Sequence, residues 1–183
     1  LYPASLTKIM TALLVLEALD REEIALTDSV QISPRAAAMK GSQALLDASA
    51  VYPLEDLLRT TIMASANDSA VALSEYIAGS EENFVDRMNR RAAELGMTNT
   101  NYVNCTGYPQ SGQYTTARDV CRLCCEIAKH PRYNQYASVW IDKLTHPSGR
   151  VTDLTNTNRL VRFYEGCDGY KTGSTDAAKY CLA

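Results

Sequence analysis

The chain opens with the stretch that decides its fold, Tyr2-Pro3-Ala4-Ser5-Leu6-Thr7-Lys8-Ile9-Met10-Thr11-Ala12-Leu13-Leu14-Val15-Leu16-Glu17-Ala18-Leu19. Most of these residues favour helix, and beyond Lys8 they are apolar around nearly the whole circumference. Such a helix is typical of the middle of a domain rather than its surface. Pro3 suits the first turn, because proline lacks the N–H group that a helix start leaves unpaired.

Two polar residues stand at the start of this expected helix, Ser5 and Lys8. Side chains three residues apart lie on one helix face and can share a hydrogen bond. Burial lowers the pKa of a lysine, so Lys8 would be neutral near pH 7 and could take the proton of Ser5. The first turn would also favour a negative charge developing at Ser5. The alternative is an N-capping serine followed by a lysine that reaches solvent, and this stretch alone does not separate the two.

Length and charge narrow the possible classes of protein. The 183 residues suit one domain with a sizeable core. The net charge of −3 and the absence of a basic run argue against nucleic acid as a partner. No apolar run reaches the length that spans a membrane.

Both ends fall within expected elements. The chain starts a few residues before the buried helix and stops inside an expected strand, Lys179–Ala183. We therefore expect a segment of a longer protein, and the lack of a targeting sequence does not indicate where that protein resides.

Six cysteines leave several possibilities open. The group Cys121-x-x-Cys124-Cys125 falls on an expected helix, and no second Cys-x-x-Cys completes a zinc site. We predict small buried residues on an apolar face made of Val120, Cys121, Cys124, Ile127 and Ala128. The thiols show no evident disulfide framework. This favours reducing surroundings and argues against a secreted enzyme, because disulfides form in oxidising compartments.

Further elements follow from periodicity and from start and stop signals. A short strand is expected within Leu26–Ile32, and residues 41–50 are irregular. Helices are expected over Pro53–Met63, over about 68–78 ending at Gly79, and over about 81–95 ending at Gly96. Another helix opens after its expected cap Thr116 and is expected to end at Pro131, and a strand is expected over Val139–Ile141.

The two histidines indicate no functional site. His130 and His146 each precede a proline, and their spacing suits no metal site, so we expect surface or turn histidines.

Ser65-x-Asn67 forms a polar corner between two apolar helices. Such a corner can point two short polar side chains into a cleft. The alternative is that Ser65 and Asn67 are ordinary helix caps.

The segment Gly166–Leu182 predicts a hairpin with its turn near Asp176 and with Lys171-Thr172-Gly173 on its first strand. A glycine within a strand often marks the close approach of another backbone, which could be substrate. The alternative is an edge-strand lysine beside a bulge glycine.

Taken together, Ser5-x-x-Lys8, Ser65-x-Asn67 and Lys171-Thr172-Gly173 occur in the order typical of active-site-serine penicillin-recognising enzymes. The chain most resembles the D-alanyl-D-alanine carboxypeptidases of serine peptidase family S11, the low-molecular-mass penicillin-binding proteins. The resemblance runs over nearly the whole chain, through the blocks Pro3–Ala12, Ser65–Ala70, Leu95–Thr100, Gln113–Asp119 and Asp168–Gly173.

The chain departs from the family pattern at two positions and in extent. Ala66 stands where the family usually has glycine, and Ser174 where it usually has histidine or an aromatic residue. Neither change removes a reacting group. The resemblance also implies that the family's first strands precede this segment, and that later strands with a carboxylate-binding arginine follow it. A fragment without them would fold poorly or lack activity.

The resemblance implies catalytic roles for Ser5, Lys8 and Ser65. Ser5 would attack the carbonyl between two terminal D-alanines of a peptidoglycan stem peptide, and water would hydrolyse the acyl-enzyme. Lys8 would act as general base. Ser65 would pass a proton to the departing D-alanine nitrogen.

Substrate-binding roles are implied for Asn67, Lys171, Thr172, Gly173 and Ser174. Asn67 would hold the substrate amide and keep Lys8 in place. Lys171 and Thr172 would bind the terminal carboxylate, and the charge of Lys171 would keep Lys8 unprotonated. Gly173 would leave room for substrate, and the N–H groups of Ser5 and Ser174 would hold the oxyanion.

The implied fold is α+β, of the three-layer α/β/α type: a β-lactamase/transpeptidase-like antiparallel sheet flanked by helices. Residues 1–183 would be one partial catalytic domain, with a helical subdomain over about 20–140. The implied partners are peptidoglycan stem peptides ending in D-Ala-D-Ala and β-lactam inhibitors, with no metal and no organic cofactor. The parent protein would be extracytoplasmic and associated with the cell envelope.

Three rival functions differ in the residues that they require. A class A β-lactamase would need a Glu-x-x-Leu-Asn loop, and no such string lies between Ser65 and Lys171. A non-catalytic peptidoglycan-binding relative would not need the intact set of reacting residues. A Ser-His-Asp hydrolase would need a Gly-x-Ser-x-Gly elbow, which the chain lacks.

Overall fold

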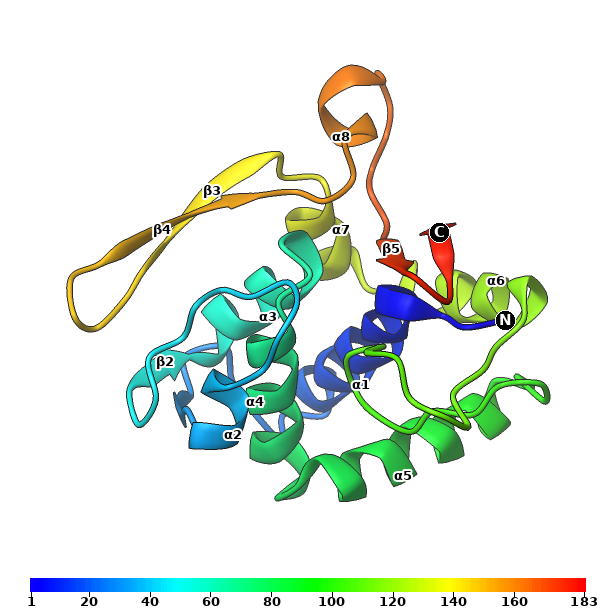
Figure 1. Ribbon diagram of the computed structural model, residues 1–183, viewed down its shortest axis with the longest axis horizontal. Helices are drawn as coiled ribbons and strands as arrows, with labels where there is room; N and C mark the ends of the chain where they lie inside the picture. Colours follow the sequence, from blue (N-terminus) through cyan, green and yellow to red (C-terminus); the bar gives the residue numbers. More distant parts are fainter.

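A buried helix lies at the centre of the molecule. The computed structural model describes residues 1–183 and begins with a 3₁₀ turn, η1 (Ala4–Leu6), that leads into helix α1 (Thr7–Asp20). Figure 1 shows α1 crossing the middle of the fold, with other helices around it. Every residue from Thr7 to Leu16 is buried, so the predicted central helix is confirmed.

The helices that surround α1 are α3 (Leu54–Met63), α4 (Asn67–Ala78), α5 (Glu81–Glu94), α6 (Ala117–Ile127) and α7 (Pro131–Ala137). Of these, α3, α4 and α5 follow the sequence-based expectations closely. Gly79 ends α4 in the left-handed conformation, at φ 77°. Thr116 caps α6 by accepting a hydrogen bond from the Asp119 N–H at 3.1 Å.

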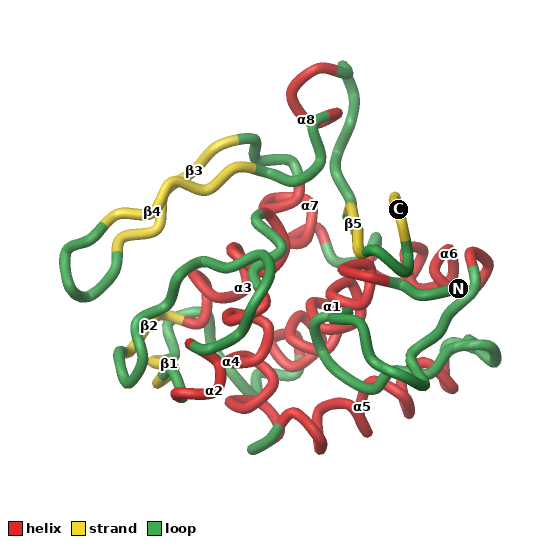
Figure 2. The backbone as a smooth tube through the Cα atoms, viewed as in Figure 1, coloured by secondary structure: helices red, strands yellow, loops and turns green.

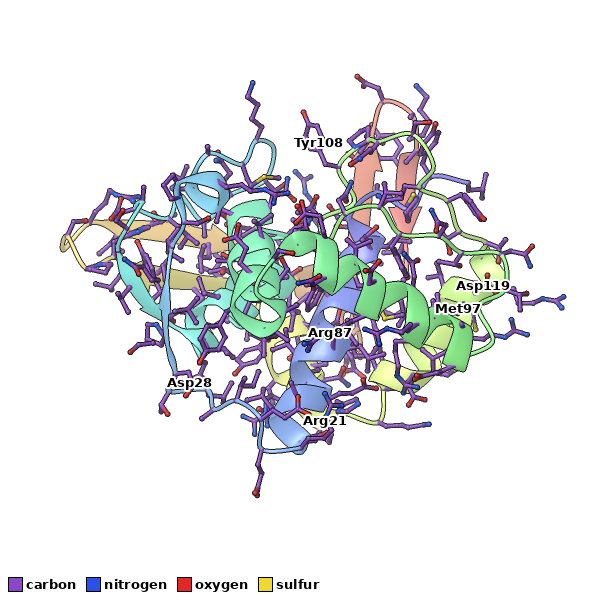
Figure 3. All side chains as sticks on the ribbon, turned by 90° about the horizontal axis from the view of Figure 1, so that it is seen from below. Arg21, Asp28, Arg87, Met97, Tyr108 and Asp119 are labelled. Atoms are coloured by element: carbon purple, nitrogen blue, oxygen red, sulfur yellow. The ribbon has the colours of Figure 1, made fainter.

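Polar contacts hold α5 against its neighbours. The Arg91 guanidinium lies 2.7 Å from Glu17 of α1 and 2.8 Å from Glu126 of α6. In Figure 3 the end of α5 near Met97 lies beside Asp119 at the start of α6. There the Asp119 carboxylate accepts the Asn99 N–H at 2.9 Å, so the loop between the two helices is tied down.

The strands form three separate antiparallel pairs. They are β1 (Ser29–Gln31) with β2 (Val51–Pro53), β3 (Ile141–Thr145) with β4 (Val151–Thr155), and β5 (Thr172–Thr175) with β6 (Lys179–Leu182). The β3–β4 hairpin projects from the body of the molecule (Figure 2). The predicted hairpin within Gly166–Leu182 is confirmed, and β5 lies against η1 (Figure 1). Two short helices, α2 (Pro34–Ala37) and α8 (Leu160–Phe163), complete the fold.

The region around α6 corrects two expectations. Helix α6 ends at Ile127, and Pro131 starts α7 instead of ending α6. Strand β3 begins at Ile141, so the expected strand over Val139–Ile141 is wrong except for its last residue. Proline at a first helical turn is favourable, so Pro131 marks the start of a helix rather than the end of one.

The apolar face predicted for α6 is only partly correct. Leu123 and Ile127 are buried, whereas Cys121 and Ala128 are exposed. The helix therefore meets the core along a narrower strip than the sequence suggested. Cys121 lies beside that strip, on the solvent side.

His146 is buried rather than at the surface, with 2 % of its area exposed. Its Nδ1 lies 2.6 Å from the Tyr52 hydroxyl, and its Nε2 lies 2.8 Å from Thr152 Oγ1. Burial lowers the His146 pKa, and the nearby charge of Arg150 lowers it further. Tyr52 lies 94 positions away in the chain, so local sequence context could not reveal this burial.

Crossing a bilayer takes a long apolar helix, and none of the helices in the structure meets that requirement.

Candidate active site

Ser5 and Lys8 lie together at the start of the central helix. Lys8 Nζ is 3.2 Å from Ser5 Oγ and donates to the Thr106 carbonyl at 2.7 Å. Lys8 is 1 % exposed, so the alternative of a lysine reaching solvent is wrong. Ser5 does not cap the helix, because Pro3 occupies that position and no side chain caps it.

The environment of Lys8 favours the neutral amine. Burial lowers the Lys8 pKa from its ordinary value to about 7, although the charge of Asp68 opposes the shift. The desolvation of an ammonium group therefore outweighs its attraction to nearby negative charge. At neutral pH a large fraction of Lys8 has a free lone pair, and Ser5 Oγ is its hydroxyl partner.

The loop that carries the Thr106 carbonyl is held tightly against η1. The Asn104 Oδ1 accepts the Gly107 N–H at 2.8 Å and the Thr106 N–H at 3.3 Å. A Cβ at Gly107 would lie 1.8 Å from the Ala4 carbonyl oxygen, so this close approach requires glycine. Sequence reasoning missed Thr106 and Gly107, because a main-chain acceptor leaves no side-chain signal.

Ser65 and Asn67 form the corner between α3 and α4. Ser65 has φ 60° and is 3 % exposed, and it lines the same pocket as Ser5. Ala66 is the N-cap of α4 and no side chain caps that helix, so neither Ser65 nor Asn67 is a helix cap. The corner therefore places polar side chains at the groove, as the first alternative predicted.

Asn67 contacts the opposite rim of the groove rather than Lys8. Its side-chain amide donates to the Lys40 carbonyl at 2.6 Å, and its backbone N–H donates to the Ser42 carbonyl at 2.8 Å. No hydrogen bond joins Asn67 to Lys8, whose partners are Ser5 and Thr106. The expectation that Asn67 holds Lys8 in place is therefore not supported by a direct contact.

Asp68 fixes the same rim from beneath. It is fully buried, and its carboxylate accepts the N–H groups of Ala44 at 3.0 Å and Leu46 at 3.1 Å. The irregular segment that contains Ser42 is thereby attached to α4. Sequence reasoning missed this role, although a charged residue next to Asn67 in an apolar helix was a usable signal.

Lys171 precedes β5 and is also buried, with 1 % of its area exposed. Its burial and its place before the strand argue against the alternative of an edge-strand lysine beside a bulge glycine. Burial lowers its pKa well below the ordinary value, and the charge of Lys8 lowers it further. Its amine donates to the Thr172 carbonyl at 3.1 Å.

Strand β5 brings two backbone N–H groups to one place. Lys171 and Ala183 exchange two backbone hydrogen bonds, at 3.3 and 2.9 Å. Because such pairs alternate along an antiparallel ladder, the Ser174 N–H points away from β6. The opposite side of β5 faces η1, where a Cβ on Gly173 would lie 3.0 Å from the Ser5 nitrogen. The close backbone that explains Gly173 is thus η1 itself.

Two adjoining pockets form the groove above these groups. One, of about 500 Å³, is lined by Ser5, Ser65 and the β5 residues Thr172, Gly173 and Ser174. The other, of about 340 Å³, is lined by Asn67 and Gly107 on one side and by Ser174 on the other. Ser5, Ser42 and Ser174 line both pockets. Six of the eight predicted site residues therefore line the groove, and the two buried lysines, Lys8 and Lys171, contact groove residues.

The arrangement can perform nucleophilic chemistry. A hydroxyl next to a buried amine is an activated nucleophile. Two N–H groups beside it can bind an oxyanion. No cluster of three or more His, Cys, Asp or Glu side chains suitable for a metal ion is present.

Comparison with known proteins agrees with this geometry. The profile of the peptidase S11 family, described as D-alanyl-D-alanine carboxypeptidase, matches residues 1–183. The chain is 44 % identical over 182 residues to the D-alanyl-D-alanine carboxypeptidase DacF of Bacillus subtilis, a match that covers 100 % of this chain and 47 % of that protein. It is 38 % identical over 188 residues to DacC of Escherichia coli, covering 98 % and 46 %.

Solved structures share the fold. Penicillin binding protein 5 from Haemophilus influenzae superposes with a TM-score of 0.92 at 34 % identity, covering 100 % of this chain and 53 % of that one. The carboxypeptidase DacD from Francisella tularensis gives a TM-score of 0.91 at 31 % identity, covering 99 % and 55 %. The α+β, transpeptidase-like fold is therefore confirmed, and the chain spans about half the length of the curated relatives it matches. With its serine and lysine paired beside β5, this chain belongs to the D-alanyl-D-alanine carboxypeptidase family, peptidase family S11.

Proposed function

We propose that the protein is a serine-type D-Ala-D-Ala carboxypeptidase that removes the terminal D-alanine from peptidoglycan stem peptides. The observation that carries the proposal is the Ser5–Lys8 pair, with 3.2 Å between hydroxyl and buried amine at the floor of a groove. Family membership supports it, because the relatives that match over the whole chain are named D-alanyl-D-alanine carboxypeptidases.

Acylation follows from the geometry. Neutral Lys8 takes the Ser5 proton while Ser5 Oγ bonds to the carbonyl carbon of the penultimate D-alanine. The N–H groups of Ser5 and Ser174 bind the oxyanion. The C–N bond then breaks as Ser65 relays the proton held by Lys8 to the leaving nitrogen, which returns Lys8 to its neutral form, and free D-alanine departs. Water hydrolyses the Ser5 ester and restores the enzyme.

Lys8 receives its orientation from the main chain. The Thr106 carbonyl takes one N–H of the amine, which leaves the lone pair for Ser5. Lys171 is a second buried amine nearby, and the charge of Lys8 adds to the burial that lowers the Lys171 pKa. The contact with Thr106 and the burial of Lys8 support Lys8 as the base.

The substrate would lie along β5. Asn67 would hold the substrate amide from the opposite rim, and Thr172 with Lys171 would bind the terminal carboxylate. Gly173 has no side chain, so η1 can pack close to β5. Ser5 would then lie next to a substrate carbonyl bound beside Ser174.

The same proposal implies the partners of the enzyme and its location in the cell. Its partners would be stem peptides ending in D-Ala-D-Ala and β-lactam antibiotics, and two of its structural neighbours are named penicillin binding proteins. The parent protein would act outside the cytoplasm at the cell envelope, through a membrane association made elsewhere in its chain. Residues 20–140 would form a helical subdomain on one side of the groove.

A serine β-lactamase is the second candidate, and it shares the acylation step. The lifetime of the penicillin adduct separates the two: turnover within seconds would favour the β-lactamase. A non-catalytic peptidoglycan-binding relative would form no adduct.

The decisive experiment is to label the purified protein with a fluorescent penicillin and to map the modified residue by mass spectrometry. We expect label on Ser5 and none in Ser5→Ala, with Ser111→Ala, an exposed loop serine, as the matched control. Release of D-alanine from diacetyl-L-lysyl-D-alanyl-D-alanine should follow the same pattern. Labelling that survives Ser5→Ala would refute the assignment.

A further inference from the structure

The smaller pocket of the groove has one charged residue on its walls, Asp176. The other residues that line this pocket of about 340 Å³ are uncharged, among them Asn67, Tyr108 and Ser174. The Asp176 side chain is exposed and belongs to no ion pair or side-chain hydrogen bond of the chain. Its negative charge is therefore free to meet a cationic ligand, and the acylation of Ser5 does not use it.

The β5–β6 turn holds Asp176 beside the groove. Thr175 pairs with Lys179 at the end of the ladder, and Thr175 Oγ1 accepts the Ala178 N–H at 3.0 Å. Figure 3 shows Tyr108 beside the tip of this hairpin, and Tyr108 is 48 % exposed. A carboxylate and an aromatic ring that line the same pocket both attract a cation.

No cation of the chain occupies this pocket. Lys40 precedes Gly41 of the pocket wall, and Lys179 follows the hairpin turn, but both lysines are exposed and neither lines the pocket. No arginine lines it either. The charge of Asp176 is therefore not neutralised from within the pocket.

The direction of the proposed substrate places one particular side chain near Asp176. With the terminal carboxylate at Thr172 and the scissile carbonyl beside Ser174, the peptide runs along β5 towards Asp176. Successive residues of an extended chain advance by about 3.3 Å. The residue that precedes the two D-alanines therefore reaches the smaller pocket, where a long side chain can extend to Asp176.

We propose that Asp176 is a specificity-determining residue that binds a side-chain ammonium group on the residue before the two D-alanines. The preferred substrate class is then a stem peptide with a free aminoalkyl side chain at that position, as a lysine provides. This inference rests on the proposed function for the placement of the peptide. It concerns a residue outside the three sequence motifs and a substrate side chain that takes no part in the cleavage.

Two ligands that differ by one charge test the proposal. Nα-acetyl-L-lysyl-D-alanyl-D-alanine has a free ε-amine, whereas the diacetyl peptide is neutral at that position. In the Ser5→Ala background, NMR titration at low salt gives the Kd of each peptide without turnover. We expect the free amine to bind about three- to fivefold more tightly, as an exposed ion pair permits. Asp176→Asn should abolish this preference and leave the Kd of the diacetyl peptide nearly unchanged.

Three controls separate a charge contact from a structural role. Asp86→Asn removes an exposed, unpaired carboxylate of α5 that lines neither groove pocket, and it should keep the preference. Asp176→Glu should restore part of the preference that Asp176→Asn loses. Salt at about 0.5 M should weaken the preference of the protein with Asp176, because ions screen exposed charges. Binding of the two peptides to Asp176→Asn should respond equally to salt.

Three results would overturn the inference: equal binding of both peptides when Asp176 is present, an undiminished preference in Asp176→Asn, or an equal loss of affinity for both peptides in that variant. Failure of the proposed function looks different. In that case the protein with Ser5 intact would release no D-alanine and form no penicillin adduct, whichever residue stands at position 176.

Discussion

At the scale of single residues, the site depends on opposing electrostatic effects at Lys8. Burial lowers its pKa to about 7, while the charge of Asp68 acts in the other direction. A lysine exposed at the surface would stay protonated at neutral pH and could not accept a proton from Ser5. The packing around α1 buries Lys8 and therefore enables it to act as the base.

This balance predicts the pH dependence of acylation. The amine form of Lys8 is the reactive one, so the second-order rate of acylation by a penicillin should rise with pH through about 7 and then level off. Below that pH the rate should fall about tenfold per unit, because the fraction of free amine falls by that factor. Stopped-flow acylation between about pH 5.5 and pH 9 measures this profile. A flat profile over the range would contradict Lys8 as the base.

At the scale of elements, the contact between β5 and η1 sets the geometry of the site. A Cβ on Gly173 would meet the Ser5 nitrogen at 3.0 Å and the Ala4 Cβ at 3.1 Å. Both distances are tighter than ordinary van der Waals contact, and one of the atoms belongs to the backbone. Glycine is therefore required here for the approach of two elements of the same chain.

Gly173→Ala tests this contact. The added methyl group should push β5 away from η1 and displace the Ser174 N–H from the Ser5 N–H. Acylation should slow about 10- to 100-fold, as expected when a reacting geometry shifts by a fraction of an ångström to an ångström. Penicillin acylation rates measure the effect, and thermal unfolding checks that the fold persists. An unchanged rate would show that the spacing of the two N–H groups does not matter.

At the scale of the whole molecule, the groove is assembled from parts of the chain that lie far apart in the sequence. Ser5 comes from η1, Ser65 and Asn67 from the α3–α4 corner, Gly107 from a loop and Ser174 from β5.

All six cysteines are free thiols. Their exposure differs widely, which makes them reporters of the global fold.

The order of thiol alkylation should follow that exposure. Cys121 and Cys125 are exposed, whereas Cys105 is buried and burial raises its pKa well above the ordinary value. Cys124 is partly buried, and burial raises its pKa to about 11. Iodoacetamide should therefore modify Cys121 and Cys125 first and Cys105 only after unfolding, because the accessible thiolate is the nucleophile. Peptide mass spectrometry over time gives the order, and early modification of Cys105 would contradict the packing described.

Local sequence determined much of this protein. The apolar run after Lys8, the cap at Thr116 and the glycine after α4 were enough to predict the main helices, because helix burial and capping depend on neighbours within a few residues. The three motifs likewise indicated the candidate site residues and the family.

Tertiary structure alone decided the rest. The Thr106 carbonyl on Lys8 and the Tyr52 contact that buries His146 join positions far apart in the chain. Main-chain acceptors and long-range neighbours leave no periodic trace in a sequence. Desolvation, which lowers the Lys8 pKa, is likewise a property of the surrounding packed volume and exists only once the chain has folded.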